Sequence, residues 1–276
     1  MTTWRSAPEP EPVPIKAMGW VRVGLRGVGL GTLVFGGLFL LLVLRLIEYP
    51  IWRHRRPWTP YITQWVCRGA FVILGIRFKS RGQAMSEHGA IAANHSSWLD
   101  IFALNARQCV YFVSKSEVAH WPGIGWLARA TGTVFIAREP KQAATQRHVL
   151  ERRLKAGHKL VFFPEGTSSD GAQVLPFKSS LYAAFFSQEL RNVTAIQPAT
   201  VFYQPPEGEA ASFYGWWGDM GFAPHLLKIL SARRQGAVIV TYHAPLKVGD
   251  FPDRKSLAKA SEDSVRSGLN AGAGPL

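Results

Sequence analysis

The chain from residue 76 onward alternates short apolar runs with segments of helical periodicity. The apolar runs predict strands over Ile76–Lys79, Ala90–Ala93, Cys109–Val113, Thr133–Ile136, Leu160–Phe163, Val193–Ala199 and Ala237–Tyr242. The segments between them predict helices over Trp98–Arg107, Ile124–Ala130, Gln142–Lys155, Ser179–Leu190 and Ser256–Arg266. Strands that alternate with helices pair mostly in parallel through helical crossovers, so we predict a single α/β domain with a largely parallel sheet.

The N-terminal quarter has a different pattern, because the chain carries no charge from Gly27 to Leu44. A helix of this length reaches about 27 Å, close to the ~30 Å hydrocarbon core of a bilayer. A second apolar block, Tyr61–Ile76, contains Arg68 and is typical of an interfacial or re-entrant helix. No small-residue cleavage site follows the first run, so we interpret it as an uncleaved anchor. One true span and a two-helix insertion in one leaflet both remain open.

These patterns divide the chain into four parts. We predict a flexible Pro/Glu-rich tail over residues 1–18 and a membrane-associating helical motif over 19–75. The α/β domain then occupies residues 76–267, and a Gly/Ala/Pro-rich disordered tail follows over 268–276.

Composition and charge favour a bilayer as the partner. Hydrophobic residues make up 47% of the chain and charged residues only 18%, yet the net charge is +14. This excess attracts polyanions, and ten tryptophans favour a membrane interface over nucleic acid, for which no binding motif is present. The two cysteines, Cys67 and Cys109, lack CxxC spacing, which indicates neither a disulfide framework nor a metal site.

The first candidate for chemistry is the pair His95 and Asp100, which follows an apolar strand. A base of near-neutral pKa next to a carboxylate that fixes its tautomer is what deprotonation of an alcohol requires. Positions i and i+5 of one helix lie roughly 140° apart, so the two side chains meet only if His95 precedes a helix that carries Asp100 in its first turn. Ser96 or Ser97 then caps that helix. The spacing alone is weak evidence.

Two further segments end strands with polar groups. Gly132–Arg138 delivers Arg138 to the end of a strand, where it binds an anion or simply pairs with Glu139. Phe163–Ser168 ends a strand in a polar loop whose amides suit an oxyanion, or which is an ordinary turn. Ile196–Pro198 is uninformative by itself.

As an ordered set, these four segments resemble the four motifs of the glycerolipid acyltransferase family, whose bacterial archetype is lysophosphatidate acyltransferase. The resemblance covers roughly residues 70–245 and rests on His95-x4-Asp100, Gly132–Arg138, Phe-Pro-Glu-Gly-Thr at 163–167, and Ile196–Pro198. It implies a membrane-bound enzyme that moves a fatty acyl group from a thioester to a hydroxyl. An inner-membrane location with the catalytic domain on the cytoplasmic side is implied as well.

The resemblance also implies roles for the residues. His95 acts as the general base and Asp100 orients it, without a serine or cysteine nucleophile. Arg138 and Glu165 correspond to the family residues that bind the acceptor. The amides around Gly166, Thr167 and Ser168 are candidate oxyanion donors. No cofactor or metal is expected, because acyl carrier protein or coenzyme A brings the acyl group as a co-substrate. The basic positions Arg147, Arg152, Arg153 and Lys155 either dock an acidic carrier protein or form a solvated face.

One departure from the family pattern bears on the acceptor. Members acting on lysophosphatidate commonly carry arginine where this chain has Ser168, so one phosphate clamp is missing, and Lys178 is a candidate substitute. Residues 168–171, 175–180 and 216–220 resemble the lyso-ornithine lipid O-acyltransferase branch. We therefore prefer a lyso-aminolipid acceptor, with lysophosphatidate as the alternative. A non-catalytic basic membrane-binding protein is less favoured, since His95 and Asp100 are both present. A hydrolase of the same fold is also less favoured, because no nucleophile elbow such as Gly-x-Ser-x-Gly supports it.

Overall fold

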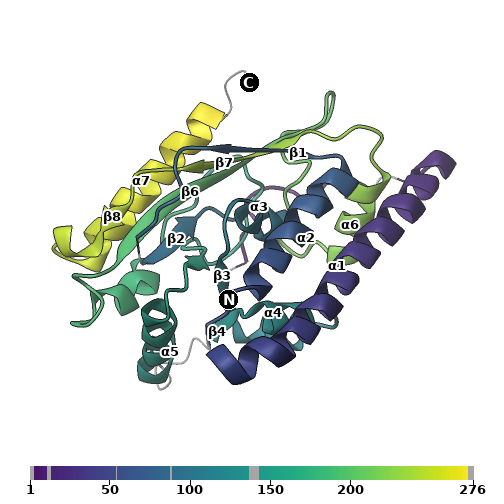
Figure 1. The fold of residues 1–276 in the computed structure, drawn as a ribbon. Coiled ribbons are helices and arrows are strands. Elements are labelled where there is room, and N and C mark those ends of the chain that lie inside the picture. Colours follow the sequence, from purple (N-terminus) through teal and green to yellow (C-terminus); the bar gives the residue numbers. More distant parts are fainter. Residues whose placement is uncertain (1–2, 11–13, 54, 88, 137–142, 273–276) are drawn as a thin grey trace.

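The computed structural model describes residues 3–10, 14–53, 55–87, 89–136 and 143–272, and they form an α/β fold on one mixed sheet (Figure 1). The sheet has eight strands, of which seven follow the order β1-β7-β6-β2-β5-β3-β4 while β8 pairs with β6. The strands are β1 (Arg77–Arg81), β2 (Gly89–Ala93), β3 (Tyr111–Lys115), β4 (Val134–Ile136), β5 (Leu160–Phe162), β6 (Ala195–Gln204), β7 (Ala237–Tyr242) and β8 (Leu246–Lys247).

Most strand pairs are parallel, as predicted, and the antiparallel pairs all involve β6. Strand β6 continues through Pro198, although proline has no N–H to donate to a sheet ladder. On the side of β6 away from β2, β8 pairs with residues 195 and 196, and β7 pairs with β6 from Ala199 onward. Pro198 therefore lies between the segments that these two strands contact. The missing N–H of Pro198 therefore leaves no ladder bond unmade.

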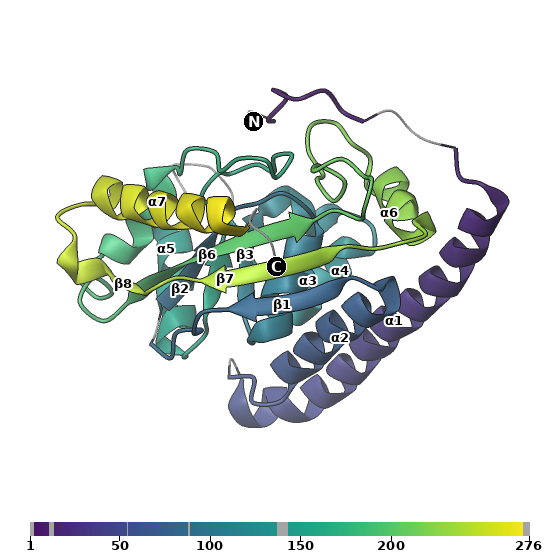
Figure 2. The same ribbon diagram turned by 90° about the horizontal axis from the view of Figure 1, so that it is seen from above.

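Helices cover both faces of the sheet (Figures 1 and 2). One face carries α2 (Thr59–Leu74), α3 (Leu99–Arg107) and α6 (Phe222–Ser231), with α1 (Ala17–Trp52) outside α2 and α6. The other face carries α5 (Ala143–Lys155), the 3-10 segment η3 (Ser179–Phe186) and α7 (Arg254–Gly272). The remaining elements are η1 (Ser116–His120), α4 (Ile124–Thr131) and η4 (Val248–Asp250).

Helix α1 is the one helix, among the described residues, that is long and apolar enough to cross a membrane. Its large apolar side chains are exposed along most of its length, as at Leu25, Phe39 and Leu46, which are 71–76% exposed. An apolar face of this size on a soluble surface is unfavourable, so it favours burial in lipid. Helix α2 approaches α1 closely at Gly37 and Gly69, where an added methyl would overlap Val66 and Leu33.

The structure differs from the predicted division of the chain in three places. Helix α2 contributes Cys67, Phe71 and Leu74 to the same core as β2 and α3, so the predicted helical motif and the predicted α/β domain share one core across residue 76. The disordered tail predicted from residue 268 begins too early, because α7 continues to Gly272 and buries Leu269. Part of the predicted flexible N-terminal tail, residues 3–10, contacts the loop at Trp217–Asp219.

Two errors concern helices. The segment from Ser179 forms 3-10 turns that end at Phe186, where an α-helix to Leu190 was predicted. Helix α6 was not predicted, because its apolar positions follow an irregular tryptophan-rich loop. It contributes Ile229 and Leu230 to the core.

Candidate functional site

The site begins at the carboxyl end of β2, where His95 lies in the turn before α3. The His95 Nδ1 atom is 2.8 Å from Asp100 Oδ2. Asp100 lies in the first turn of α3, as the spacing required, and its side chain is fully buried. The turn and the helix therefore bring together the two groups that the sequence singled out.

The Asp100 carboxylate is surrounded by four hydrogen-bonding partners. Besides His95, Oδ2 accepts the backbone N–H groups of Ser96 and Ser97 at 2.9 and 3.0 Å. The other oxygen, Oδ1, accepts the Tyr203 hydroxyl at 2.8 Å. The Ser97 hydroxyl accepts the N–H of Leu99 at the start of α3 at 3.3 Å, as the predicted serine cap requires, and the carboxylate accepts the two amides before it. These contacts fix the orientation of Asp100.

The imidazole of His95 is held on its face as well as at Nδ1. It stacks on Phe163 with ring centroids 4.0 Å apart and an interplanar angle of 14°. Its side chain remains 20% exposed. When Nδ1–H donates to Asp100, Nε2 carries the lone pair, which is the arrangement of a general base.

Glu165 lies directly beneath this turn, and its contacts are with the main chain. Its side chain accepts the N–H of His95 at 2.7 Å through Oε1 and the N–H of Leu175 at 3.0 Å through Oε2. Glu165 is 2% exposed, and burial raises its pKa to about 8. In the structure it ties the loop after β5 to the turn after β2. The predicted contact between Glu165 and an acceptor hydroxyl stays a prediction.

The loop after β5 lies at the same edge as His95. Gly166 has a φ of 72°, which favours glycine, and its N–H donates to the Phe163 carbonyl. Ser169 N–H donates to the His95 carbonyl at 2.9 Å, so the half-buried Thr167 and Ser168 are held next to His95. Among the described residues, the amides of Thr167 and Ser168 donate to no acceptor, so they remain candidates for an oxyanion.

The remaining predicted site residues are placed unevenly. The backbone of Lys178 is tied to Pro164 beside this loop, and its side chain is exposed. Arg138 and Glu139 lie outside the described residues. Within the part of the chain that the structure describes, no cluster of three His, Cys, Asp or Glu side chains is arranged to hold a metal ion.

Three residues of the site were not assigned a place from the sequence. Tyr203 follows another aromatic residue, Phe202, in β6, and no local signal marks it as a partner of Asp100. The side chain of Asn94 clamps the backbone of Val201 on β6 through both its oxygen and its nitrogen. The backbone N–H of Trp216 donates to the Ser96 carbonyl at 2.8 Å, which places the tryptophan-rich loop against the turn that carries His95.

The architecture is shared with a solved enzyme. The 1-acyl-sn-glycerophosphate acyltransferase PlsC of Thermotoga maritima superposes with a TM-score of 0.60 and 19% sequence identity, covering 91% of this chain and 99% of that chain. This similarity shows the α/β fold with its N-terminal apolar helix.

Sequence relatives give the family. The acyltransferase family matches residues 76–201. A lyso-ornithine lipid O-acyltransferase of Rhodobacter capsulatus is 56% identical over 96% of both chains, and one of Rhizobium meliloti is 35% identical over 92% of this chain and 87% of the relative. A 1-acyl-sn-glycerol-3-phosphate acyltransferase of Neisseria gonorrhoeae is 31% identical over 72% of this chain and 77% of the relative. The resemblance in four motifs is thus confirmed, and the chain belongs to the acyltransferase family as an O-acyltransferase.

Proposed function

We propose that the chain transfers a fatty acyl group from an acyl thioester to the free hydroxyl of a lyso-ornithine-type lipid, with His95 as the general base. The observation that carries the reaction is the His95 Nδ1–Asp100 Oδ2 contact, in which the imidazole remains 20% exposed. The observation that carries the acceptor is the 56% identity to a lyso-ornithine lipid O-acyltransferase along 96% of the chain.

The proposed reaction is a direct attack without a covalent enzyme intermediate. His95 Nε2 takes the proton of the acceptor hydroxyl as its oxygen bonds to the thioester carbonyl carbon. The tetrahedral oxyanion collapses, the carbon–sulfur bond breaks, and the imidazolium returns the proton to the leaving thiolate. Asp100 stabilises the imidazolium, and the amides of Thr167 or Ser168 stabilise the oxyanion.

The proposed acceptor is supported by the charge of the loop after β5. Ser168 is half-buried where relatives acting on lysophosphatidate commonly carry arginine, and a hydroxyl binds a phosphate more weakly than a guanidinium does. Asp170, next along this loop, adds a carboxylate that disfavours a phosphate and suits an amine. Lysophosphatidate remains the second candidate, since it is the acceptor named by the 31% identical relative.

We also propose that the enzyme works at the inner membrane with its catalytic domain in the cytoplasm, and that acyl carrier protein or coenzyme A is the donor. The exposed apolar face of α1 supports the membrane. Fewer basic residues of α5 are available to dock a carrier protein than the sequence indicated. Arg147 and Arg152 are exposed, whereas Arg153 stacks on Tyr111 and Lys155 pairs with Glu189.

The test offers the purified chain lyso-ornithine lipid and lysophosphatidate in competition, with one acyl thioester. We expect faster acylation of lyso-ornithine lipid, and a shift of the ratio toward lysophosphatidate in Ser168→Arg. The His95→Ala variant is the control for the base and should retain less than about a thousandth of the activity. Faster acylation of lysophosphatidate by the unmodified chain would overturn the acceptor. Activity of a few per cent or more in His95→Ala would overturn the mechanism.

A further inference from the structure

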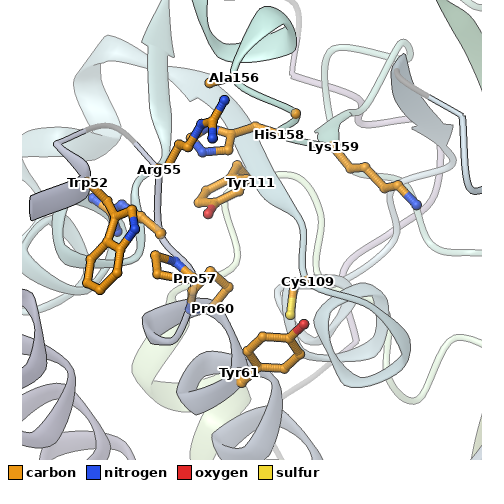
Figure 3. Close-up of a pocket in the computed structure, with 12 residues that line it drawn as sticks. Trp52, Arg55, Pro57, Pro60, Tyr61, Cys109, Tyr111, Ala156, His158 and Lys159 are labelled. Atoms are coloured by element: carbon orange, nitrogen blue, oxygen red, sulfur yellow. The ribbon is translucent and has the colours of Figure 1, made fainter. Parts of the chain in front are cut away.

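A cavity lies at the ends of the strands opposite to His95. Its volume is about 490 Å³, within the range of roughly 300–1,000 Å³ that is usual for ligand sites (Figure 3). Cys109 and Lys159 precede β3 and β5, whereas His95 and Glu165 follow the ends of β2 and β5. Because β2, β5 and β3 are mutually parallel, the cavity and the catalytic turn lie at opposite ends of these strands.

The cavity is strongly cationic. Arg55, Arg56 and Lys159 line it, and Arg153 lies behind its wall with its guanidinium 4.5 Å from the centre of the Tyr111 ring. Burial lowers the pKa of Arg56 and lowers that of Arg153 to about 10, and repulsion between the two adds to the shift of Arg153. Like charges gathered in a partly desolvated site are unfavourable unless an anion joins them.

No carboxylate of the described residues neutralises these cations by an ion pair. Arg56 and Arg153 instead donate to the carbonyls of Ala130 and Gly132, which hold their guanidinium groups in place. Arg153 Nε is buried and has no acceptor among the described residues. The nearby Glu48 is engaged by Trp58, Thr59 and Arg45.

The position of the cavity indicates which class of anion reaches it. Its other wall is formed by the end of α1 and the start of α2, including Trp52, Pro57 and Tyr61, as Figure 3 shows. The exposed apolar face of α1 ends here, and Tyr61 and Trp58 are exposed beside it. Tyrosine, tryptophan and arginine at the end of an apolar helix are typical of the headgroup level of a bilayer.

We propose that this cavity binds the phosphate of an anionic phospholipid, at a site separate from the catalytic one. The proposal rests on the membrane association included in the proposed function, but not on the identity of the acceptor. Arg55 and Arg56 contact the phosphate, and the glycerol and acyl chains extend along α1. Lys159 adds positive charge from the far wall, where its ammonium donates to the Met85 carbonyl. The lipid thereby neutralises charge that the described residues leave without an ion pair.

Cys109 lines the cavity and provides a direct probe of its occupancy. The full-length chain in a neutral maltoside detergent is treated with a maleimide, and modification of each cysteine is followed by peptide mass spectrometry. Burial raises the pKa of the Cys109 thiol, so the reaction is run at about pH 8.5. Cys67 is 4% exposed in the core, and its modification reports unfolding in every sample.

Three additives separate the possible ligands: dihexanoyl phosphatidylglycerol, dihexanoyl phosphatidylcholine and inorganic phosphate, each at the same concentration below micelle formation. We expect phosphatidylglycerol to slow the modification of Cys109 in proportion to 1 + [L]/Kd, roughly tenfold near ten times its dissociation constant. Equal protection by phosphatidylcholine would overturn the charge argument. Equal protection by inorganic phosphate would overturn the assignment to a lipid.

A pair of variants tests the residues. Arg55→Glu reverses a charge at the rim, and Arg254→Glu is the matched control, since both arginines are exposed and neither makes a side-chain hydrogen bond within the described residues. We expect Arg55→Glu to lose most of the protection and Arg254→Glu to keep it. Unchanged protection in Arg55→Glu contradicts the proposal. His95→Ala should keep full protection, so failure of the lipid site and failure of the proposed function are distinguished.

Discussion

Charged side chains at the two ends of the parallel strands have different kinds of partner. At the carboxyl ends of β2 and β5, Asp100 and Glu165 are buried carboxylates whose oxygens are all engaged by donors. At the other ends of the strands, Arg56 and Arg153 are partly buried cations that have carbonyl partners but no ion pair with a described carboxylate. The difference matches the two proposed tasks. A general base needs fixed partners from its own chain, whereas a site proposed to bind an anion needs charge that remains available to the ligand.

The largest effect is expected from Asp100→Asn, which removes the carboxylate partner of His95 but keeps the shape of the side chain. The amide has one acceptor oxygen and brings an N–H₂ group to a position already occupied by donors, so His95 loses the partner that holds its tautomer. We expect kcat to fall about a thousandfold or more with little change in KM. Steady-state acyl transfer measures this, with the exposed Asp250→Asn as the control. A loss below tenfold would show that Asp100 does not orient the base.

A smaller effect is expected from Tyr203→Phe, which removes one donor from the same carboxylate. Oδ1 of Asp100 then lies buried without its hydroxyl partner, at a cost of about 1–3 kcal/mol in the free energy of unfolding. We expect kcat to fall roughly tenfold, since the other contacts of Asp100 remain. Thermal unfolding and kcat are measured together. An unchanged kcat with the expected loss of stability would assign Tyr203 a purely structural role.

The smallest effect on catalysis, and a distinctive one on stability, is expected from Glu165→Gln. Burial raises the pKa of Glu165 from 4.5 to about 8, so the folded chain binds this proton more tightly than the unfolded chain. The contribution of Glu165 to stability is therefore present below pH 4.5 and is lost as the pH rises to about 8, by a few kcal/mol.

Glutamine does not titrate, so the unfolding temperature of Glu165→Gln should fall less than that of the unmodified chain between about pH 5 and about pH 8.5. Circular dichroism in neutral detergent follows the unfolding, and the exposed Glu209→Gln is the control. Equal slopes in the variant and the unmodified chain would contradict a buried, proton-binding Glu165.

The sequence predicted best what depends on local spacing. The contact of His95 with Asp100 follows from a strand, a turn and a helix start, and the positions of the seven longer strands follow from their apolar runs. Contacts across the sheet left no local signal. Tyr203 reaches Asp100 from a strand that is 103 residues away in sequence, and only the register of β6 against β2 brings them together.

Burial was the other property that the sequence did not convey. The sequence does not distinguish a Glu165 that binds a substrate from one that binds two backbone amides. Only the packing of the loop after β5 shows the contacts with the amides. The cationic cavity is similarly distributed over the connector after α1, the start of β3 and the start of β5. Arg55, Cys109 and Lys159 acquire a common role only when the helix pair folds against the sheet.

The close approach of α1 and α2 at Gly37 and Gly69 has a mechanical consequence. The two helices interlock through Val66 and Leu33, and α2 is packed in the same core as α3, whose first turn carries Asp100. Among the described residues, packed helices therefore connect the exposed apolar face of α1 to the turn that carries His95. In the proposed membrane-bound state, this packing would hold His95 at a fixed distance from the bilayer, and so would set the depth from which a lipid hydroxyl reaches it.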